Sequence, residues 1–497
     1  MIDLKNSLNF WRRLSQPWLI LLILSGNLWT KQVLAIEPIP FESSITKNGI
    51  CRADLTEGIN QIIDQDKFER SRWGILVEVL DSKETLYALE EDKYFIPASN
   101  AKILTTAAVL LKFGSQFRLE TPIYITGNFP HLQTLKLVGK GDPSLTTDQL
   151  NNLVKFLKIR GITKIDNLIV EEDNIDDSGI ESTWEWEDIH YYYATAVNDL
   201  ILNENAIILK LIPQEIGEPL KLQWSDPIAA QQWQVKNNGI TGKQGTPNSI
   251  EIKENFGQPM LNIEGELAVD SQPDIFGLAV VNPRNYFLES LKNIFIQEGI
   301  TINNSTISEA KNNDYYGSKL TSIKSEKLAV LISKTNQESN NIFAESLLKL
   351  LADNNEDISK LEGLEETLTQ LGVDPNSYQL KDGSGLSRQN LVTPSALVTT
   401  LRLMSETREA QTYRESLAIG GVKGTLKNRF KETSIEGNLQ GKTGTLTGSS
   451  TLSGYLTSPN YSDLVFSIMV NQSDVPVSEI REAIDSIILR LGQIKKC

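Results

Sequence analysis

The chain has 497 residues, of which 40% are hydrophobic and 22% are charged, and its formal net charge is −15. This composition is that of an ordinary globular protein and argues against a disordered or fibrous one. The acidic balance disfavours nucleic acid or an anionic membrane surface as a partner. The length predicts two or three domains.

The first 35 residues have the pattern of a signal peptide. Basic residues precede an apolar run at 18–24, and Ala35 ends a small-x-small cleavage sequence. The apolar run is shorter than a transmembrane helix needs. We expect a periplasmic or otherwise exported protein whose mature chain begins near Ile36. An uncleaved membrane anchor is the alternative.

The chain has only two cysteines and two histidines, which are fewer ligands than a metal site usually needs, so we expect neither a metal nor another cofactor. In an oxidising compartment, Cys51 and Cys497 are expected to form a disulfide between the two ends of the mature chain. Two unpaired cysteines are the alternative. Neither His131 nor His190 has a G-x-S-x-G partner, so a serine enzyme would more readily use lysine as its base.

Beyond Cys51, the segments WGILVEVL and ETLYALE predict a β-hairpin across residues 73–90. A helix follows Pro97, since apolar residues recur at helical spacing from Ile103 onward. Ser99 and Lys102 would share one face of its first turn, where an amine beside a hydroxyl suits a nucleophile and its base. S-x-x-K also occurs at three other places in the chain, so this pattern alone is weak evidence.

The middle of the chain has a different texture. Residues 119–200 alternate short apolar strands with a helix at 148–158, and residues 201–277 are strand-like and rich in Gly, Pro, Asn and Gln. Helical patterns resume at 285–297 and at 325–351. This texture predicts a largely β insertion nested within a second insertion.

The end of the chain predicts three short strands in GKTGTL, STLSGYL and DLVFSIMV. An amphipathic helix, SEIREAIDSIILRLGQI, follows Pro476. Strands near both ends of the chain, each next to a helix, predict one α+β domain assembled from the two terminal regions.

Three downstream segments are candidates for function. They are S-x-N at Ser339-Asn340-Asn341, at the head of a helix, the predicted loop DGSGLSR at 382–388, and K-T-G at Lys442-Thr443-Gly444, at the start of a strand. Taken singly, each is also an ordinary helix cap, turn or strand end. Arg388, in the loop, is a candidate to counter a substrate carboxylate.

The ordered set S-x-x-K, S-x-N and K-T-G resembles that of the penicillin-recognising serine peptidases. A separation of 240 residues between Ser99 and Ser339 makes the chain similar to the low-molecular-mass class C penicillin-binding proteins, the D-alanyl-D-alanine carboxypeptidase/endopeptidase family. Segments that look like signatures of this family are PASNAKILTTAAVL, LVGKGDPSL, TNQESNNIFAESLL, KDGSGLSRQN, GGVKGTLKNR and GKTGTLTGSSTLSGYL.

The resemblance implies an α+β fold: a serine β-lactamase/transpeptidase-like domain, with helices on an antiparallel sheet, carrying two nested, largely β inserted domains. The expected divisions are a signal peptide at 1–35, the catalytic domain at 36–118 and 321–497, inserted domain II at 119–200 and 278–320, and inserted domain III at 201–277.

The resemblance also implies a role for each residue of the first two motifs. Ser99 would be the nucleophile, and Lys102 would be its base, kept neutral by burial and by the nearby cation Lys442. Ser339 would relay the proton to the leaving amine, and Asn341 would hold the substrate amide.

The strand that bears K-T-G would bind the substrate. The backbone N–H groups of Ser99 and Thr445 would stabilise the oxyanion, and Thr443, Gly444 and Thr445 would receive the terminal carboxylate of a D-Ala-D-Ala stem. The family often has an aspartate after a strand of its second domain. Here Glu171 stands at that place, so recognition of a diamino-acid side chain does not carry over directly.

The implied function is cleavage of D-Ala-D-Ala stem peptides of peptidoglycan through an acyl-enzyme, with sensitivity to β-lactams and without cofactor. A β-lactamase is one alternative, disfavoured because the chain lacks an E-x-x-L-N deacylation segment and carries a long insertion. A non-catalytic peptidoglycan-binding or penicillin-sensing protein is another, disfavoured because all three motifs are intact.

Overall fold

The computed structural model describes residues 49–497 apart from 173–177, 256, 310–316 and 353–357. The expected signal peptide therefore lies outside the described residues. The described chain separates into two compact units. The smaller comprises Trp186–Thr195 and Asn205–Ser290, and the larger comprises the rest. The finer division into nested domains stays a prediction.

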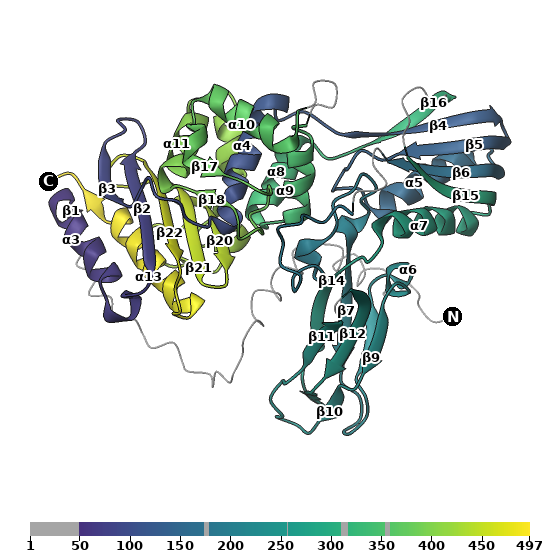
Figure 1. Ribbon diagram of the computed structural model, residues 1–497, viewed down its shortest axis with the longest axis horizontal. Coiled ribbons are helices and arrows are strands. Elements are labelled where there is room, and N and C mark those ends of the chain that lie inside the picture. Colours follow the sequence, from purple (N-terminus) through teal and green to yellow (C-terminus); the bar gives the residue numbers. More distant parts are fainter. Residues whose placement is uncertain (1–48, 173–177, 256, 310–316, 353–357) are drawn as a thin grey trace, which may run out of the picture. The chain divides into compact units, whose positions relative to one another are not determined.

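A six-stranded antiparallel sheet forms the centre of the part of the larger unit that is built from the two terminal regions of the chain. Its strands, in spatial order, are β19 (Ala418–Ile419), β20 (Leu439–Leu446), β21 (Ser449–Leu456), β22 (Leu464–Asn471), β2 (Arg72–Val79) and β3 (Thr85–Leu89). Figure 1 shows the early strand β2 beside the late strand β22, and Arg72 is paired with Asn471 at one end of this pair. The prediction of one α+β domain built from both terminal regions is thus confirmed.

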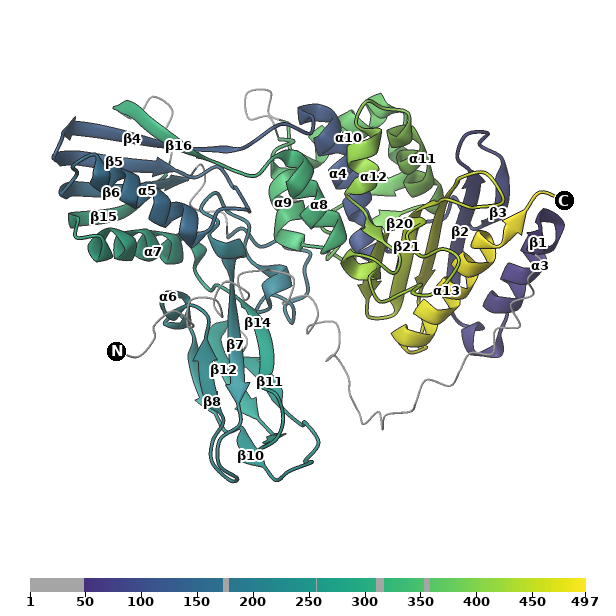
Figure 2. The ribbon, with the colours of Figure 1, turned by 180° about the vertical axis from the view of Figure 1, so that it is seen from behind.

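Helices cover both faces of this sheet, because successive side chains of a strand point to opposite sides. Ile75 and Val77 belong to one hydrophobic core, whereas Leu76 belongs to the other. The first core contains helices α3 (Arg52–Ile63) and α13 (Val477–Gly492), and the second contains α4 (Ala101–Phe113) and α11 (Pro394–Ser405). Figures 1 and 2 show these two helical layers from opposite sides.

Three further helices pack beside α4 in the second core, and together they enclose it. They are α8 (Leu328–Gln337), α9 (Asn341–Lys349) and α10 (Lys360–Leu371). The sequence pattern predicted helical structure at 325–351 with a helix that begins at the S-x-N motif, and a new helix does begin there. Ser339 has a positive φ of 59°, and the Asn340 side chain caps the new helix by accepting from Phe343 N at 3.2 Å. The break comes at the S-x-N motif itself.

The larger unit contains a second, five-stranded sheet. Its strands, in spatial order, are β15 (Thr301–Glu309), β6 (Lys164–Glu172), β5 (His131–Val138), β4 (Glu120–Asn128) and β16 (Ser318–Lys324). Helix α5 (Thr147–Ile159) begins with a capping box between Thr146 and Gln149. Helix α7 (Pro283–Gln297) precedes β15.

The smaller unit is largely β structure, as the texture of residues 201–277 predicted. One sheet contains β14 (Asp274–Ala279), β7 (Ala206–Ile212) and β8 (Lys221–Trp224), and another contains β11 (Glu251–Asn255), β12 (Gln258–Glu264) and β9 (Gln234–Asn237). A two-stranded sheet joins β10 (Ile240–Gly242) to β13 (Glu266–Ala268), and the short helix α6 spans Pro227–Ala230.

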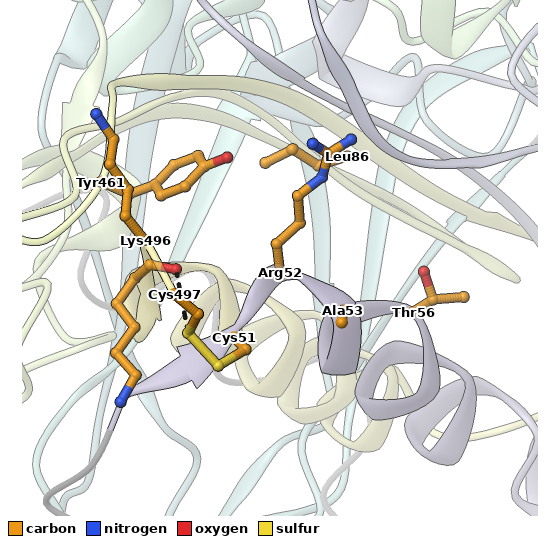
Figure 3. A pocket seen from close by; sticks show the side chains of 9 residues that line it. Cys51, Arg52, Ala53, Thr56, Leu86, Tyr461, Lys496 and Cys497 are labelled. Atoms are coloured by element: carbon orange, nitrogen blue, oxygen red, sulfur yellow. Dashed lines mark hydrogen bonds between the residues drawn. A yellow bond between two sulfur atoms is a disulfide. The ribbon is translucent and has the colours of Figure 1, made fainter.

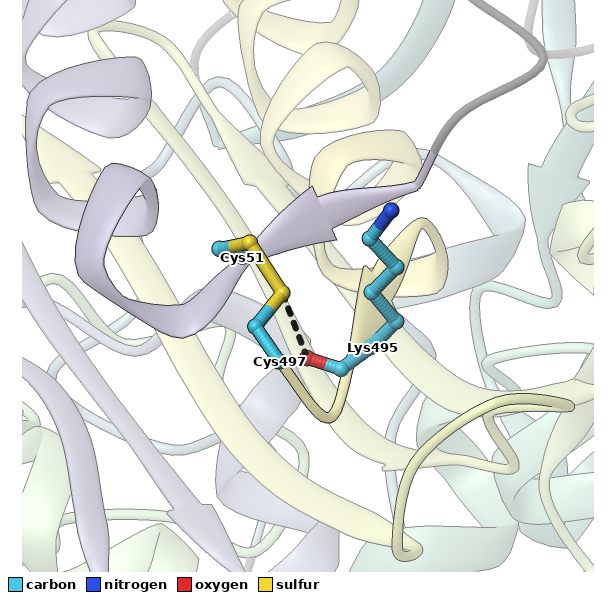
Figure 4. Close-up of a disulfide and its surroundings, with 3 residues drawn as sticks. All are labelled: Cys51, Lys495 and Cys497. Atoms are coloured by element: carbon cyan, nitrogen blue, oxygen red, sulfur yellow. Dashed lines mark hydrogen bonds between the residues drawn. A yellow bond between two sulfur atoms is a disulfide. The ribbon is translucent and has the colours of Figure 1, made fainter.

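The two ends of the described chain meet at the edge of the catalytic domain. Strand β1 (Ile50–Cys51) runs parallel to β23 (Ile494–Lys495), and a disulfide joins Cys51 to Cys497 with the Cα atoms 5.7 Å apart (Figure 4). An open pocket of about 680 Å³ lies beside this disulfide, with Arg52 and Tyr461 in its lining (Figure 3). The remaining short elements of the catalytic part are α12 (Ala410–Glu415), β17 (Tyr378–Gln379) and β18 (Leu391–Val392).

Candidate active site

The candidate nucleophile lies in a strained turn. Ser99 is in a 3₁₀ turn, Ala98–Asn100, immediately before α4 rather than in the first turn of that helix as the sequence predicted. Ala98 has a φ of 47°, a conformation that a non-glycine residue rarely adopts and that often marks functional sites. The turn still brings Ser99 and Lys102 side by side, because they are three positions apart on a helical path.

Lys102 is fully buried at the start of α4 and has three polar neighbours. Its Nζ atom lies 3.1 Å from Ser99 Oγ, 2.6 Å from Asn341 Oδ1 and 2.6 Å from the carbonyl oxygen of Ser384. A lysine without exposed surface is rare unless such partners receive its hydrogens. The amine is therefore held against the serine hydroxyl.

Burial also decides the charge of this amine. Loss of solvation lowers the pKa of Lys102 to about 7, although the nearby carboxylates of Asp382 and Glu345 act in the opposite direction. A substantial fraction of Lys102 is then neutral near pH 7, and only the neutral amine can accept the proton of Ser99.

The second lysine lies on β20 and holds the second serine. Lys442 is also fully buried, and its Nζ donates to Ser339 Oγ at 2.8 Å and to the Thr443 carbonyl at 2.7 Å. Burial, and then the charge of Lys102, hold the pKa of Lys442 well below its usual range. The structure thus brings together Ser99, Lys102, Ser339, Asn341 and Lys442, which come from three distant parts of the sequence.

Strand β20 runs close to the nucleophile turn, and glycine at 444 makes this approach possible. A Cβ atom on Gly444 would lie 2.3 Å from Thr451 Oγ1, 2.8 Å from the Pro97 carbonyl and 3.0 Å from Ser99 N. Strand β20 begins at Leu439, so K-T-G lies inside the strand and not at its start as predicted. On the far side of β20 the two-residue β19 pairs with Gln440 and Gly441, and among the described residues no strand pairs there with residues 442–446.

Both threonines of this strand have hydroxyl partners. Thr443 Oγ1 donates to Thr425 Oγ1 at 2.8 Å, and Thr445 Oγ1 accepts from Arg481 Nη2 at 3.0 Å. Arg481 comes from α13, and the sequence analysis did not single it out. Its amphipathic helix gave no signal that one arginine of the polar face would reach K-T-G.

Arg388 is already engaged by protein groups. Its Nε atom lies 2.6 Å from Glu185 Oε1, and its Nη1 donates to the Thr447 carbonyl at 3.1 Å. The residue therefore bridges the loop at 382–388 to the turn after β20. Its expected contact with a substrate carboxylate stays a prediction.

The D-G-S-G loop is organised by Asp382, which is fully buried. Its carboxylate accepts from the backbone N–H groups of Gly385 and Ser387 at 2.8 and 2.7 Å and from Trp184 Nε1 at 2.9 Å. Gly385, with a φ of 81°, is pressed against the nucleophile turn, since a Cβ there would lie 1.8 Å from the Ala98 carbonyl oxygen. The loop thus packs against the backbone of the turn that holds Ser99.

Other candidates from the sequence lie elsewhere. His131 lies on β5 with its Nε2 atom 3.0 Å from Asp166 Oδ1, and His190 belongs to the smaller unit. Glu171 is fully buried, and its Oε2 accepts from Lys136 Nζ at 2.8 Å. In the part of the chain that the structure describes, no group of three or more His, Cys, Asp or Glu residues is arranged to hold a metal ion. Nor does any described helix combine the length and apolarity needed to cross a membrane.

Comparison with known proteins agrees with this geometry. Residues 55–491 match the D-Ala-D-Ala carboxypeptidase 3 (S13) family. The chain is 29% identical to a D-alanyl-D-alanine carboxypeptidase of Actinomadura sp. (strain R39), covering 90% of this chain and 86% of the relative. It is 26% identical to penicillin-sensitive carboxypeptidase A of Dictyostelium discoideum, covering 85% and 87%.

The fold has a solved counterpart. The crystal structure of penicillin binding protein 4 from Haemophilus influenzae aligns with a TM-score of 0.76 at 23% identity, covering 89% of this chain and 98% of that one. A second structure of that protein, in complex with a β-lactam, aligns with a TM-score of 0.70. Because the family match extends over most of the chain, this protein belongs to the D-Ala-D-Ala carboxypeptidase 3 (S13) family.

Proposed function

We propose that this protein is a penicillin-sensitive serine D-Ala-D-Ala carboxypeptidase that acts on peptidoglycan stem peptides through an acyl-enzyme on Ser99. One observation carries the proposal. A buried amine with a pKa of about 7, that of Lys102, lies 3.1 Å from the hydroxyl of Ser99. A serine hydroxyl becomes a useful nucleophile only when such a base takes its proton.

In the acylation step, Ser99 Oγ attacks the carbonyl carbon of the penultimate D-alanine while its proton passes to Lys102. The negative charge that develops on the carbonyl oxygen is stabilised by the backbone N–H groups of Ser99 and Thr445. Removing one such donor typically costs about 3 kcal/mol of transition-state stabilisation. The close approach of Gly444 to the nucleophile turn supports this pairing of donors.

Departure of D-alanine requires a proton on its nitrogen as the C–N bond breaks. Ser339 is suited to deliver it, because its hydroxyl accepts from Lys442 at 2.8 Å and can pass its own proton to the leaving amine. Asn341, whose Oδ1 accepts from Lys102 Nζ at 2.6 Å, is suited by its place beside the base to hold the substrate amide. Water then hydrolyses the ester on Ser99 and restores the enzyme.

The terminal carboxylate of the substrate, or that of a penicillin, fits the strand that bears K-T-G. Thr443 and Thr445 present hydroxyl groups there, and the side chains of Lys442 and Arg481 contact this strand. We propose that Arg388 adds a further cation at this end of the site. The names of the relatives, which describe carboxypeptidases and penicillin sensitivity, support this choice of substrate and inhibitor.

Labelling with a fluorescent penicillin tests the proposal. The parent protein should be labelled, should lose the label slowly, and should release D-alanine from a pentapeptide. Ser99→Ala should show neither labelling nor release while keeping the thermal unfolding midpoint of the parent. Rapid loss of label would indicate a β-lactamase, labelling without D-alanine release would indicate a penicillin sensor, and undiminished labelling of Ser99→Ala would remove Ser99 as the nucleophile.

A further inference from the structure

A buried carboxyl group lies behind the candidate base. Glu345 is on helix α9, four residues after Asn341, and only 2% of its surface is exposed. Residues four apart lie on one face of a helix, so Glu345 and Asn341 point the same way. Apart from Ser346, the buried residues around it on this helix are apolar: Ile342, Phe343, Ala344, Leu347 and Leu348. A charged residue in such a place is costly and calls for a physical reason.

The carboxyl group holds the backbone of the D-G-S-G loop. Its Oε1 atom accepts from Gly383 N at 2.9 Å and from Ser384 N at 2.7 Å. The carbonyl of the same Ser384 accepts from Lys102 Nζ at 2.6 Å. Glu345 is therefore linked to the candidate base through one residue of the loop.

This link fixes the direction of the lone pair of Lys102. A neutral amine has two hydrogens and one lone pair. The two shortest contacts of Lys102, 2.6 Å each to Asn341 Oδ1 and to the Ser384 carbonyl, use both hydrogens. The lone pair then points to the third contact, Ser99 Oγ at 3.1 Å. The proton of this hydroxyl is the one that Lys102 must accept. Loss of the Ser384 acceptor would leave this orientation undefined.

We propose that Glu345 is a positioning residue of the catalytic base: it fixes the Ser384 carbonyl that orients Lys102, and its carboxylate charge acts on the same amine. This inference rests on the proposed function, because it assumes that Lys102 is the base for Ser99. It assigns to the S-x-N helix a second task, besides presenting Ser339 and Asn341.

The electrostatic surroundings support the second half of the proposal. Burial, and then Asp382, raise the pKa of Glu345, while Lys360 acts in the opposite direction and Glu181 adds to the rise. The charges of Asp382 and Glu345 both raise the pKa of Lys102. Among the described residues, Glu345 Oε2 has no hydrogen-bond partner, so the loop holds the carboxyl group through Oε1 alone. Removal of the Glu345 charge should therefore lower the pKa of Lys102.

Two substitutions separate orientation from charge. Glu345→Gln keeps an oxygen for the two N–H groups but removes the charge. The acid limb of the pH profile, where the acylation rate rises with pH, should therefore move to lower pH by at least about half a unit. The plateau rate should stay within about threefold of the parent. Glu345→Asp keeps the charge but shortens the side chain, so the acid limb should stay in place while the plateau falls by about tenfold or more.

The measurement is the second-order rate constant for acylation by penicillin between pH 5 and 9, with folding checked by thermal unfolding. Glu78→Gln is the matched control. This partly buried carboxylate lies on β2, with its Oε2 atom 3.6 Å from Arg402 Nε, and it contacts none of the motif residues. The control should have the pH profile of the parent.

Each outcome decides something. An acid limb that is unchanged in Glu345→Gln, or a plateau that is unchanged in Glu345→Asp, would overturn the role of Glu345 while leaving the proposed function intact. A purely structural glutamate would lower the unfolding midpoint in both variants without moving the acid limb. A parent protein that penicillin does not acylate on Ser99 would overturn the proposed function, and this inference with it.

Discussion

Burial gives two ordinary lysines their chemistry. Lys102 and Lys442 have no exposed surface, and each is held by hydroxyl and carbonyl oxygens rather than by a directly bonded carboxylate. The loss of solvation lowers both pKa values, and the charge of Lys102 lowers the pKa of Lys442 further, whereas the expected effect of Lys442 on Lys102 is not among the causes of the Lys102 shift. A neutral amine at neutral pH follows from this packing and needs no metal or histidine.

Replacing Lys102 by arginine tests this account of the base. Arginine keeps a positive charge but stays protonated, so it cannot accept the proton of Ser99. We expect Lys102→Arg to lose acylation by roughly 10³-fold or more, because a nucleophile and its base act as a unit. Penicillin acylation followed by stopped flow or intact mass would measure this. A rate within tenfold of the parent would show that Lys102 is not the base.

The motif residues were predictable because their spacing is a property of the sequence itself. S-x-x-K, S-x-N and K-T-G each occupy a few consecutive positions, and their order along the chain is distinctive. Glu345 and Asp382 were not predicted, since an acidic residue on an amphipathic helix or in a loop carries no sign of its burial. The sequence did offer one sign of the burial of Glu345: this residue interrupts an apolar run of the helix four residues, about one turn, after Asn341.

At the scale of elements, the site depends on close backbone contact between three segments: the nucleophile turn, strand β20 and the D-G-S-G loop. Gly444 and Gly385 allow these contacts. The hairpin, the three late strands and the last helix were predicted from periodicity. The start of a helix at S-x-N was also predicted, whereas the left-handed backbone of Ser339 was not, because the apolar pattern continues across it.

Substitution of Gly385 by alanine should show how much the loop contributes. The new Cβ would lie 1.8 Å from the Ala98 carbonyl oxygen, so the nucleophile turn or the loop must shift. We expect acylation to fall by about 100-fold or more, since displacements of about 1 Å in a site cost about that much.

Gly437→Ala is the matched control for this change. Gly437 also has a positive φ, 76°, but a Cβ there would meet no atom within 4 Å. The Gly437→Ala substitution should lower the free energy of unfolding by about 1 kcal/mol through backbone strain alone and leave the acylation rate unchanged. Equal acylation by the two variants would mean that the contact between Gly385 and Ala98 does not hold the nucleophile in place.

At the scale of the molecule, the catalytic domain is closed by its own ends. Strands β1 and β23 pair, and the disulfide joins residues separated by 446 positions. The expected signal peptide would direct the chain to a compartment in which such a bond persists. The smaller unit, by contrast, has its own sheets, and its role could not be inferred from its sequence because it carries none of the three motifs.

The disulfide should be intact in exported protein and should add to its stability. Thiol titration under denaturing, non-reducing conditions should find no free thiol. Cys497→Ser should lower the free energy of unfolding by about 2–5 kcal/mol, since the cross-link restricts a long loop in the unfolded chain. The double variant Cys51→Ser/Cys497→Ser controls for the unpaired thiol and should behave alike. Two free thiols in the parent would contradict the pairing.

The order of strands in the catalytic sheet also determines when the enzyme can exist during its own synthesis. Ser99 and Lys102 are translated early, whereas β20, β21 and β22 come from residues 439–471. Until those strands arrive, β2 has only β3 beside it, and an isolated hairpin is at best marginally stable in water. A nascent chain that stops before β20 lacks Lys442, so by the proposed mechanism we expect it to have no peptidase activity until nearly all of the chain has been made.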